Sequence, residues 1–104
     1  MQTKKPLKMY VLVRNDLDTT YRGVQGIHAV AAFYESGNFT NWHNDTVVQL
    51  AVRNEDHLKS WMWKISKLNK CYSCFYEPDL GGQLTSIACV DTGEIFKNLP
   101  LAKN

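Results

Sequence analysis

Two carboxylates stand at the end of an apolar run in the last third of the chain. Glu77 and Asp79 flank Pro78, and Gly81 and Gly82 follow them. Proline removes a backbone donor and ends strand pairing, and glycine accepts backbone angles that other residues resist. A carboxylate held in this way can act as a placed catalytic group. It can also serve the turn itself, because an Asp side chain accepts hydrogen bonds from nearby backbone N–H groups.

A second set of side chains, three of them polar, shares one face of a helix predicted from Thr19 or Thr20 to about Ser36. Its members are spaced by four, three and four residues: Tyr21, Gln25, His28 and Ala32. The N-terminal end of this stripe would lie beside the strand edge that carries Asp79, where it can line a cleft. Alternatively, Gln25 and His28 are boundary residues that bond to neighbouring backbone.

Arg22 lies in the first turn of the same helix. A cation at this position opposes the helix dipole, which is mildly unfavourable. A guanidinium group binds phosphate through two parallel hydrogen bonds. Arg22 is therefore either an ordinary solvated side chain or a residue that holds a phosphate group.

The hydrophobic pattern predicts the elements that position these residues. Apolar runs rich in β-branched or aromatic residues predict strands over residues 8–13, 46–53, 71–76 and 84–90. Two helices lie between them, the second running from Asn54 as its N-cap to about Asn69. The first helix shows an apolar stripe of Val24, Ile27, Ala31 and Tyr34, and the second one of Leu58, Trp61, Ile65 and Leu68. The tail from residue 93 is expected to form a short helix or an extra strand.

This β-α-β-α-β-β order predicts a single α/β domain with a mixed four-stranded sheet and helices packed on its faces. Strand–helix–strand units cross over right-handed and make parallel strands, and the last two strands are close enough to be antiparallel. Ligands bind outside the carboxyl ends of strands in such sheets. Arg14, Asp16, Arg53 and Gln83 follow or adjoin those ends, so we expect them to bind substrate beside Asp79.

Composition sets wide limits on function. The chain has 104 residues, a formal net charge of +2, three cysteines and three histidines. This charge permits binding to a polyanion without arguing for it. The cysteines, and the lack of an export signal or of an apolar run near 18 residues, predict a cytoplasmic protein without membrane contact. Cys71 and Cys74 would face opposite sides of a strand, and the histidines show no metal-ligand spacing, so we expect no metal or cofactor.

Lysines on the second helix leave two interpretations open. These are Lys59, Lys64, Lys67 and Lys70. They are either a solvated helix face or, together with Lys4, Lys5 and Lys8, a basic surface for nucleic acid.

Three motifs in order resemble the type 2 peptidyl-tRNA hydrolases. A Val-rich strand runs into Arg-Asn-Asp-Leu at 14–17, where family members have Arg-x-Asp-Leu. Gln-Gly-Ile-His-Ala at 25–29 is similar to the family's A-Q-x-x-H-A helix start, and Asp-Leu-Gly at 79–81 to its D-A-G turn. The order and spacing cover nearly the whole chain.

The resemblance implies hydrolysis of the ester between a peptide and the 3′ ribose of tRNA, without a metal or cofactor. It implies that Asp79 orients or activates the attacking water, and that Gln25 and His28 lie beside the cleft. Arg22 stands where the family has a lysine-bearing G-K-G-K loop, which is about two residues shorter here. The family's D-A-G-R-T-Q becomes Asp-Leu-Gly-Gly-Gln-Leu-Thr, so Thr85 lies two residues after the family's Thr.

Other functions fit the same residues. The first is a catalytically inactive domain of the same fold that binds RNA or a protein partner. A second is an esterase or amidase for a small molecule. The sequence also leaves a homodimer open.

Overall fold

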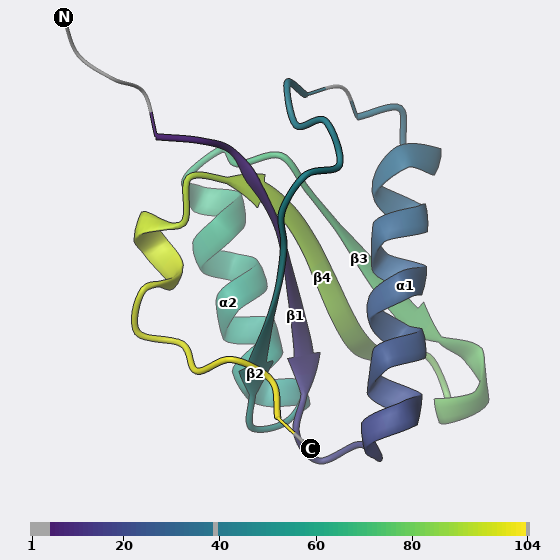
Figure 1. The fold of residues 1–104 in the computed structure, drawn as a ribbon. Coiled ribbons are helices and arrows are strands. Elements are labelled where there is room, and N and C mark those ends of the chain that lie inside the picture. The colour runs from purple at the N-terminus through teal and green to yellow at the C-terminus, as the bar shows by residue number, and fades with distance from the viewer. Residues whose placement is uncertain (1–4, 39, 104) are drawn as a thin grey trace, which may run out of the picture.

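The computed structural model describes residues 5–38 and 40–103. It confirms the predicted order of elements (Figure 1). The main elements are β1 (Lys8–Arg14), α1 (Thr19–Glu35), β2 (Val47–Val52), α2 (Glu55–Lys67), β3 (Tyr72–Glu77) and β4 (Gln83–Asp91). Two short 3₁₀ helices follow β3 and β4: η1 (Pro78–Leu80) and η2 (Glu94–Phe96).

The four strands form one mixed sheet in the order β2-β1-β4-β3. β1 pairs parallel to β2, whereas β4 is antiparallel to both β1 and β3. The strands β1, β2 and β3 therefore end at one edge, and β4 begins there. The start of α1 and the C-terminal tail lie at the same end of the molecule (Figure 1). This is the shared edge that the sequence predicts.

Each face of the sheet carries one helix. Leu58 and Ile65 of α2 pack in a core cluster with Leu12 of β1. On the other face, Ala29 and Phe33 of α1 belong to a second cluster. Alternate side chains of a strand point to opposite faces, which is why one strand contributes to both clusters.

The predicted apolar stripe of α1 is wrong, because that stripe faces outward. Ile27 is 70% exposed, and Val24 and Tyr34 are also exposed. The buried side of α1 instead carries Arg22, Gln25, Gly26, Ala29 and Phe33. At Gly26 an added Cβ would lie 3.0 Å from Val11 Cγ1, so the helix backbone comes close to β1. Small residues on this side let the helix approach the sheet closely. The packing gained in this way is more favourable than burying the larger residues of the outer stripe.

The helix ends differ from prediction in detail. Asp18, rather than Thr19 or Thr20, is the N-cap of α1, and its carboxylate accepts a hydrogen bond from the Thr20 N–H at 3.2 Å. Asn54 caps α2 as predicted, accepting from the His57 N–H at 3.0 Å. Leu68, which the sequence places on the buried stripe of α2, is exposed beyond the end of that helix.

The tail forms both a short helix and an extra strand contact. After η2, the Ala51 N–H donates to the Pro100 carbonyl at 2.9 Å, and the Ala102 N–H donates to the Gln49 carbonyl at 2.9 Å. Leu101 thus pairs antiparallel with Leu50 along the free edge of β2. No helix within residues 5–38 and 40–103 combines the length and the hydropathy needed to cross a membrane.

Candidate functional site

A buried polar group at the end of β3 is centred on Glu77, which is 8% exposed. Gln25 Nε2 donates to Glu77 Oε1 at 2.9 Å, and Thr85 Oγ1 donates to Gln25 Oε1 at 2.6 Å. The Asp79 N–H donates to Glu77 Oε2 at 3.3 Å. These bonds join α1, β3 and β4, and they fix the turn that carries Asp79. Gln25 and Thr85, both predicted site residues, are thus brought together.

The surroundings of Glu77 favour its charged form. The hydrogen bond from Gln25 lowers the pKa of Glu77 below its usual value, against an opposing effect of burial. The hydrogen bond from the Asp79 N–H and the charge of His28 lower this pKa further. Burial raises the pKa of Tyr21, as do the charges of Glu77 and Asp79, so the phenol stays protonated and can donate.

Asp79 is exposed at the surface of this turn. Within the described part of the chain, its carboxylate takes part in no hydrogen bond or ion pair. The expected turn cap is supplied by Glu77 instead, while Gly81 and Gly82 adopt the left-handed backbone that the turn requires (φ 64° and 82°). Asp79 is therefore a carboxylate on a fixed backbone that is open to water.

His28 lies on the same face of α1 as Gln25 and is exposed. Its ring stacks on Phe75 of β3, with 4.3 Å between centroids and 9° between planes. This contact orients the imidazole beside the end of β3. Since Gln25 of the same stripe bonds to Glu77, the predicted stripe and the turn meet at one place.

Arg14, Asp16 and Gln83 form a second group at the same edge. Arg14 is 5% exposed and donates from Nε and Nη2 to the two Asp16 oxygens at 2.9 and 2.7 Å. Its Nη1 donates to Gln83 Oε1 at 2.9 Å and to the Leu84 carbonyl at 3.0 Å. The hydrogen bond from Arg14 lowers the pKa of Asp16. Arg14 and Gln83 thus join β1 to β4, and the Asp16 side chain is 40% exposed.

Arg22 does not join Asp79, and this part of the predicted site is wrong. Its Nη1 donates to Asn15 Oδ1 at 2.7 Å, while Nη2 donates to Thr19 Oγ1 at 3.4 Å and to the Lys103 carbonyl. Successive residues of a helix are about 100° apart around its axis. Tyr21 therefore faces Glu77, and Arg22 faces the C-terminal tail.

The remaining basic residues are dispersed. Arg53 is exposed after β2, and its backbone N–H donates to His57 Nδ1 at 3.0 Å. Three lysines of the predicted basic surface pair with carboxylates: Lys5 with Glu94, Lys59 with Glu55 and Lys70 with Asp91. Lys4 lies outside the described residues. Among the described residues, no group of three or more His, Cys, Asp or Glu side chains could hold a metal ion.

Sequence reasoning missed the roles of Glu77 and Tyr21. Both were visible, Glu77 as the first of two carboxylates and Tyr21 as the first member of the helical stripe. The available signal was strand alternation, because Ser73 is buried on the α1 face and Phe75 and Glu77 follow at intervals of two. That periodicity directs Glu77, and not Asp79, toward α1.

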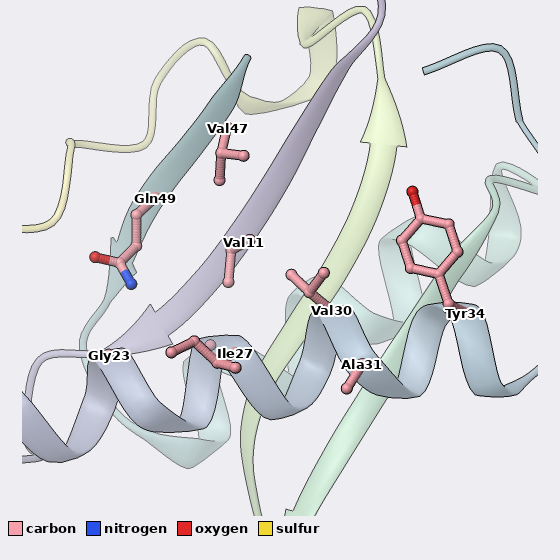
Figure 2. A pocket seen from close by; sticks show the side chains of 9 residues that line it. Val11, Gly23, Ile27, Val30, Ala31, Tyr34, Val47 and Gln49 are labelled. Atoms are coloured by element: carbon pink, nitrogen blue, oxygen red, sulfur yellow. The ribbon is translucent and has the colours of Figure 1, made fainter. Parts of the chain in front are cut away.

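The outward stripe of α1 lines an open apolar groove of about 550 Å³ beside β2 (Figure 2). Figure 2 shows side chains of α1, β1 and β2 around it. They include Val11, Ile27, Val30, Tyr34, Val47 and Gln49. The groove is separate from the Glu77 group because it lies on the other side of α1.

Comparisons with known proteins support the fold. No protein-family model matches the chain, and no curated protein does. Among solved structures it is similar to a protein of unknown function from Agrobacterium tumefaciens strain C58, with a TM-score of 0.70 and 11% identity. The match covers 93% of this chain and 98% of that chain. At this level of identity the likeness shows a shared α/β fold.

Proposed function

We propose that the chain hydrolyses the ester bond between a peptide and the 3′ ribose of tRNA. The observation that carries this proposal is the placement of Asp79. Its carboxylate is exposed and unpaired within the described residues, yet its backbone is tied to α1 through Glu77 and Gln25. The sequence resemblance to type 2 peptidyl-tRNA hydrolases supplies the substrate class.

The reaction adds the elements of water across the ester. Asp79 accepts a proton from the attacking water as hydroxide adds to the carbonyl carbon. The negative charge on the tetrahedral oxygen needs a hydrogen-bond donor, and the protonated phenol of Tyr21 is suited to this role. Collapse of the intermediate breaks the bond to the ribose oxygen, which takes the proton. His28, held on Phe75, is placed to orient the substrate or to pass that proton.

Glu77 is a positioning residue in this scheme. Its oxygens accept from Gln25 and from the Asp79 N–H, and the residue is buried, so it is not open to the attacking water as Asp79 is. Gln25 and Thr85 act indirectly, because Thr85 bonds to Gln25 and Gln25 holds Glu77. The proposed catalytic residues are therefore Asp79, Tyr21 and His28.

The test is release of free tRNA from a peptidyl-tRNA analogue by purified protein. We expect Asp79→Asn to lower kcat by at least about 100-fold, the usual effect of losing a general base. Asp56→Asn is the control, because Asp56 is an exposed carboxylate in the first turn of α2. Circular dichroism should show that both variants are folded. Equal rates for wild type and Asp79→Asn would rule out the proposal.

A second candidate is a non-catalytic domain of the same fold that binds RNA. It is favoured because Arg14, a buried arginine at this edge of the sheet, is committed to protein acceptors and so does not stabilise a tetrahedral oxyanion. This candidate predicts salt-dependent tRNA binding without turnover. The three free cysteines suit a reducing compartment such as the cytoplasm under either function.

A further inference from the structure

Arg22 is a buried cation that no carboxylate neutralises within the described residues. It is 6% exposed, and its three acceptors are neutral: an amide oxygen, a hydroxyl and a backbone carbonyl. Buried charges are ordinarily paired with an opposite charge, because desolvation is costly. Arg14, at the same edge of the sheet, shows that usual arrangement with Asp16. The charge of Arg22 is therefore available to an anion.

An open cavity of about 550 Å³ lies at Arg22. Asn15, Asp18 and Thr19 line it from the start of α1, and Pro100, Leu101 and Lys103 line it from the tail. It lies beyond the carboxyl ends of β1 and β2, where ligands bind in sheets of this kind. The Asp18 carboxylate accepts a hydrogen bond from the Thr20 N–H, and the exposed Lys103 is one of the residues that line the cavity.

Residues 100–103 cover this cavity as a strap. Two backbone hydrogen bonds hold them to β2, one from Ala51 to Pro100 and one from Ala102 to Gln49. Leu101 is 61% exposed and the small Ala102 packs against a core cluster, so the strap buries little apolar surface. Segments with few buried contacts open at a small free-energy cost. At the end of the strap, the Lys103 carbonyl oxygen accepts a hydrogen bond from Arg22 Nη2.

We propose that Arg22 is the centre of a phosphate-binding site and that residues 100–103 are a displaceable strap over it. A phosphate oxygen would take the place of the Lys103 carbonyl on the guanidinium. The exchange is favourable because a charge-assisted hydrogen bond to an anion is stronger than one to a neutral carbonyl. The phosphate belongs either to an RNA backbone or to a small phosphorylated molecule. This site does not depend on hydrolysis at Asp79.

The first test is a titration of the ¹⁵N-labelled protein with pyrophosphate, followed by NMR. We expect the amide signals of Asn15 and Thr19 to shift as the site fills. Ala102→Pro removes the N–H that bonds to Gln49 and should free the strap without shortening the chain. It should lower the Kd for pyrophosphate about threefold or more, because the competent state is then more populated. Asn98→Ala changes an exposed tail residue outside both the cavity and the strap, so it should bind like wild type.

Variants of Arg22 separate a built site from general attraction. Arg22→Gln should raise the Kd for pyrophosphate at least about tenfold in both the wild-type and the Ala102→Pro backgrounds. The Kd of Arg22→Lys should lie between those of the wild type and Arg22→Gln, since lysine keeps the charge without the planar guanidinium geometry. Equal binding by Arg22→Gln, or no shift at Asn15 and Thr19 in the wild type, would mean an adventitious ion only. Equal affinities of Ala102→Pro and Asn98→Ala would overturn the strap.

A second titration distinguishes the source of the phosphate. A short single-stranded RNA should compete with pyrophosphate if the site takes a backbone phosphate, and it should leave pyrophosphate bound if the site takes a small molecule. The readout is the Thr19 amide, so the result stands whether or not tRNA is hydrolysed. A variant that fails to fold does not block this measurement, because it uses the wild-type chain.

Discussion

Gln25 Nε2 and Glu77 Oε1 lie 2.9 Å apart, and this contact sets both the rotation of α1 and the place of Asp79. It joins a fully buried amide to a nearly buried carboxylate across the interface between α1 and β3. Because Glu77 also accepts from the Asp79 N–H, the turn is fixed relative to the helix that carries Tyr21 and His28. The proposed catalytic groups are thus positioned by a pair that does not itself react.

Gln25→Leu should be strongly destabilising. Leucine has a similar volume, but it cannot donate to Glu77 Oε1, and it would leave Thr85 Oγ1 with only the Phe75 carbonyl at 3.3 Å as acceptor. A buried polar group that loses its partner costs about 1–3 kcal/mol, so we expect the free energy of unfolding to fall by about 2–4 kcal/mol. Urea denaturation measures this change. Gln49→Leu is the matched control, because that glutamine is exposed and should change stability by no more than about 0.5 kcal/mol.

Acid should destabilise the fold partly through Glu77. Its pKa in the folded state is lowered below its usual value of 4.5, chiefly by the hydrogen bond from Gln25. A lowered folded-state pKa contributes stability above the unfolded pKa, and this contribution is lost as the pH falls through the folded value. Between pH 6 and pH 3, the wild type should therefore lose more stability than Glu77→Gln. Urea denaturation at each pH measures both curves, and parallel curves would contradict the prediction.

The element order, the sheet and the shared edge could all be predicted from the sequence. Each depends on local periodicity and on the handedness of crossovers, which a single chain displays. The position of Arg22 and the orientation of α1 could not. That helix has two faces able to pack, one with larger residues around Ile27 and one with smaller residues around Ala29.

The choice between those faces is made by contacts between distant parts of the chain. Gln25 meets Glu77 fifty-two positions later, and Gly26 lets β1 approach the helix backbone. Neither contact can be read from helical spacing, which ranks faces by hydrophobicity alone. Once the smaller face is buried, Arg22 is carried away from Asp79 and toward the tail.

Two substitutions on α1 test this orientation. Phe33 is fully buried, so Phe33→Ala should lower the free energy of unfolding by about 3–5 kcal/mol through the cavity it leaves. Ile27 is largely exposed, and Ile27→Ala should change it by no more than about 0.5 kcal/mol. Both values come from urea denaturation. A larger loss of stability at Ile27 than at Phe33 would mean that α1 buries the face with the larger residues, as the sequence pattern predicts.

Two of the cysteines should resist alkylation in the folded protein. Burial raises the pKa of Cys74 to about 11 and that of Cys89 to about 12. At pH 8 only roughly one thiol in a thousand, or fewer, is then the reactive thiolate. Iodoacetamide followed by peptide mass spectrometry should label both cysteines slowly until urea unfolds the chain. Rapid labelling of Cys89 in the native protein would contradict its burial.

Two glycines of α1 should respond oppositely to alanine. In a helix interior, alanine is favoured over glycine by about 1 kcal/mol. At Gly23 an added Cβ meets nothing within 4 Å, so Gly23→Ala should realise most of that gain. At Gly26 the Cβ would lie 3.0 Å from Val11 Cγ1 and 3.3 Å from Gln49 Nε2.

The helix cannot move outward at Gly26 without lengthening the bond between Gln25 and Glu77, so Gly26→Ala should lose stability despite its better helix propensity. Urea denaturation of the two variants gives the comparison. An equal gain at both positions would show that α1 packs less closely on β1 than the Gly26 contact requires. It would also remove the reason why the smaller face of the helix is buried.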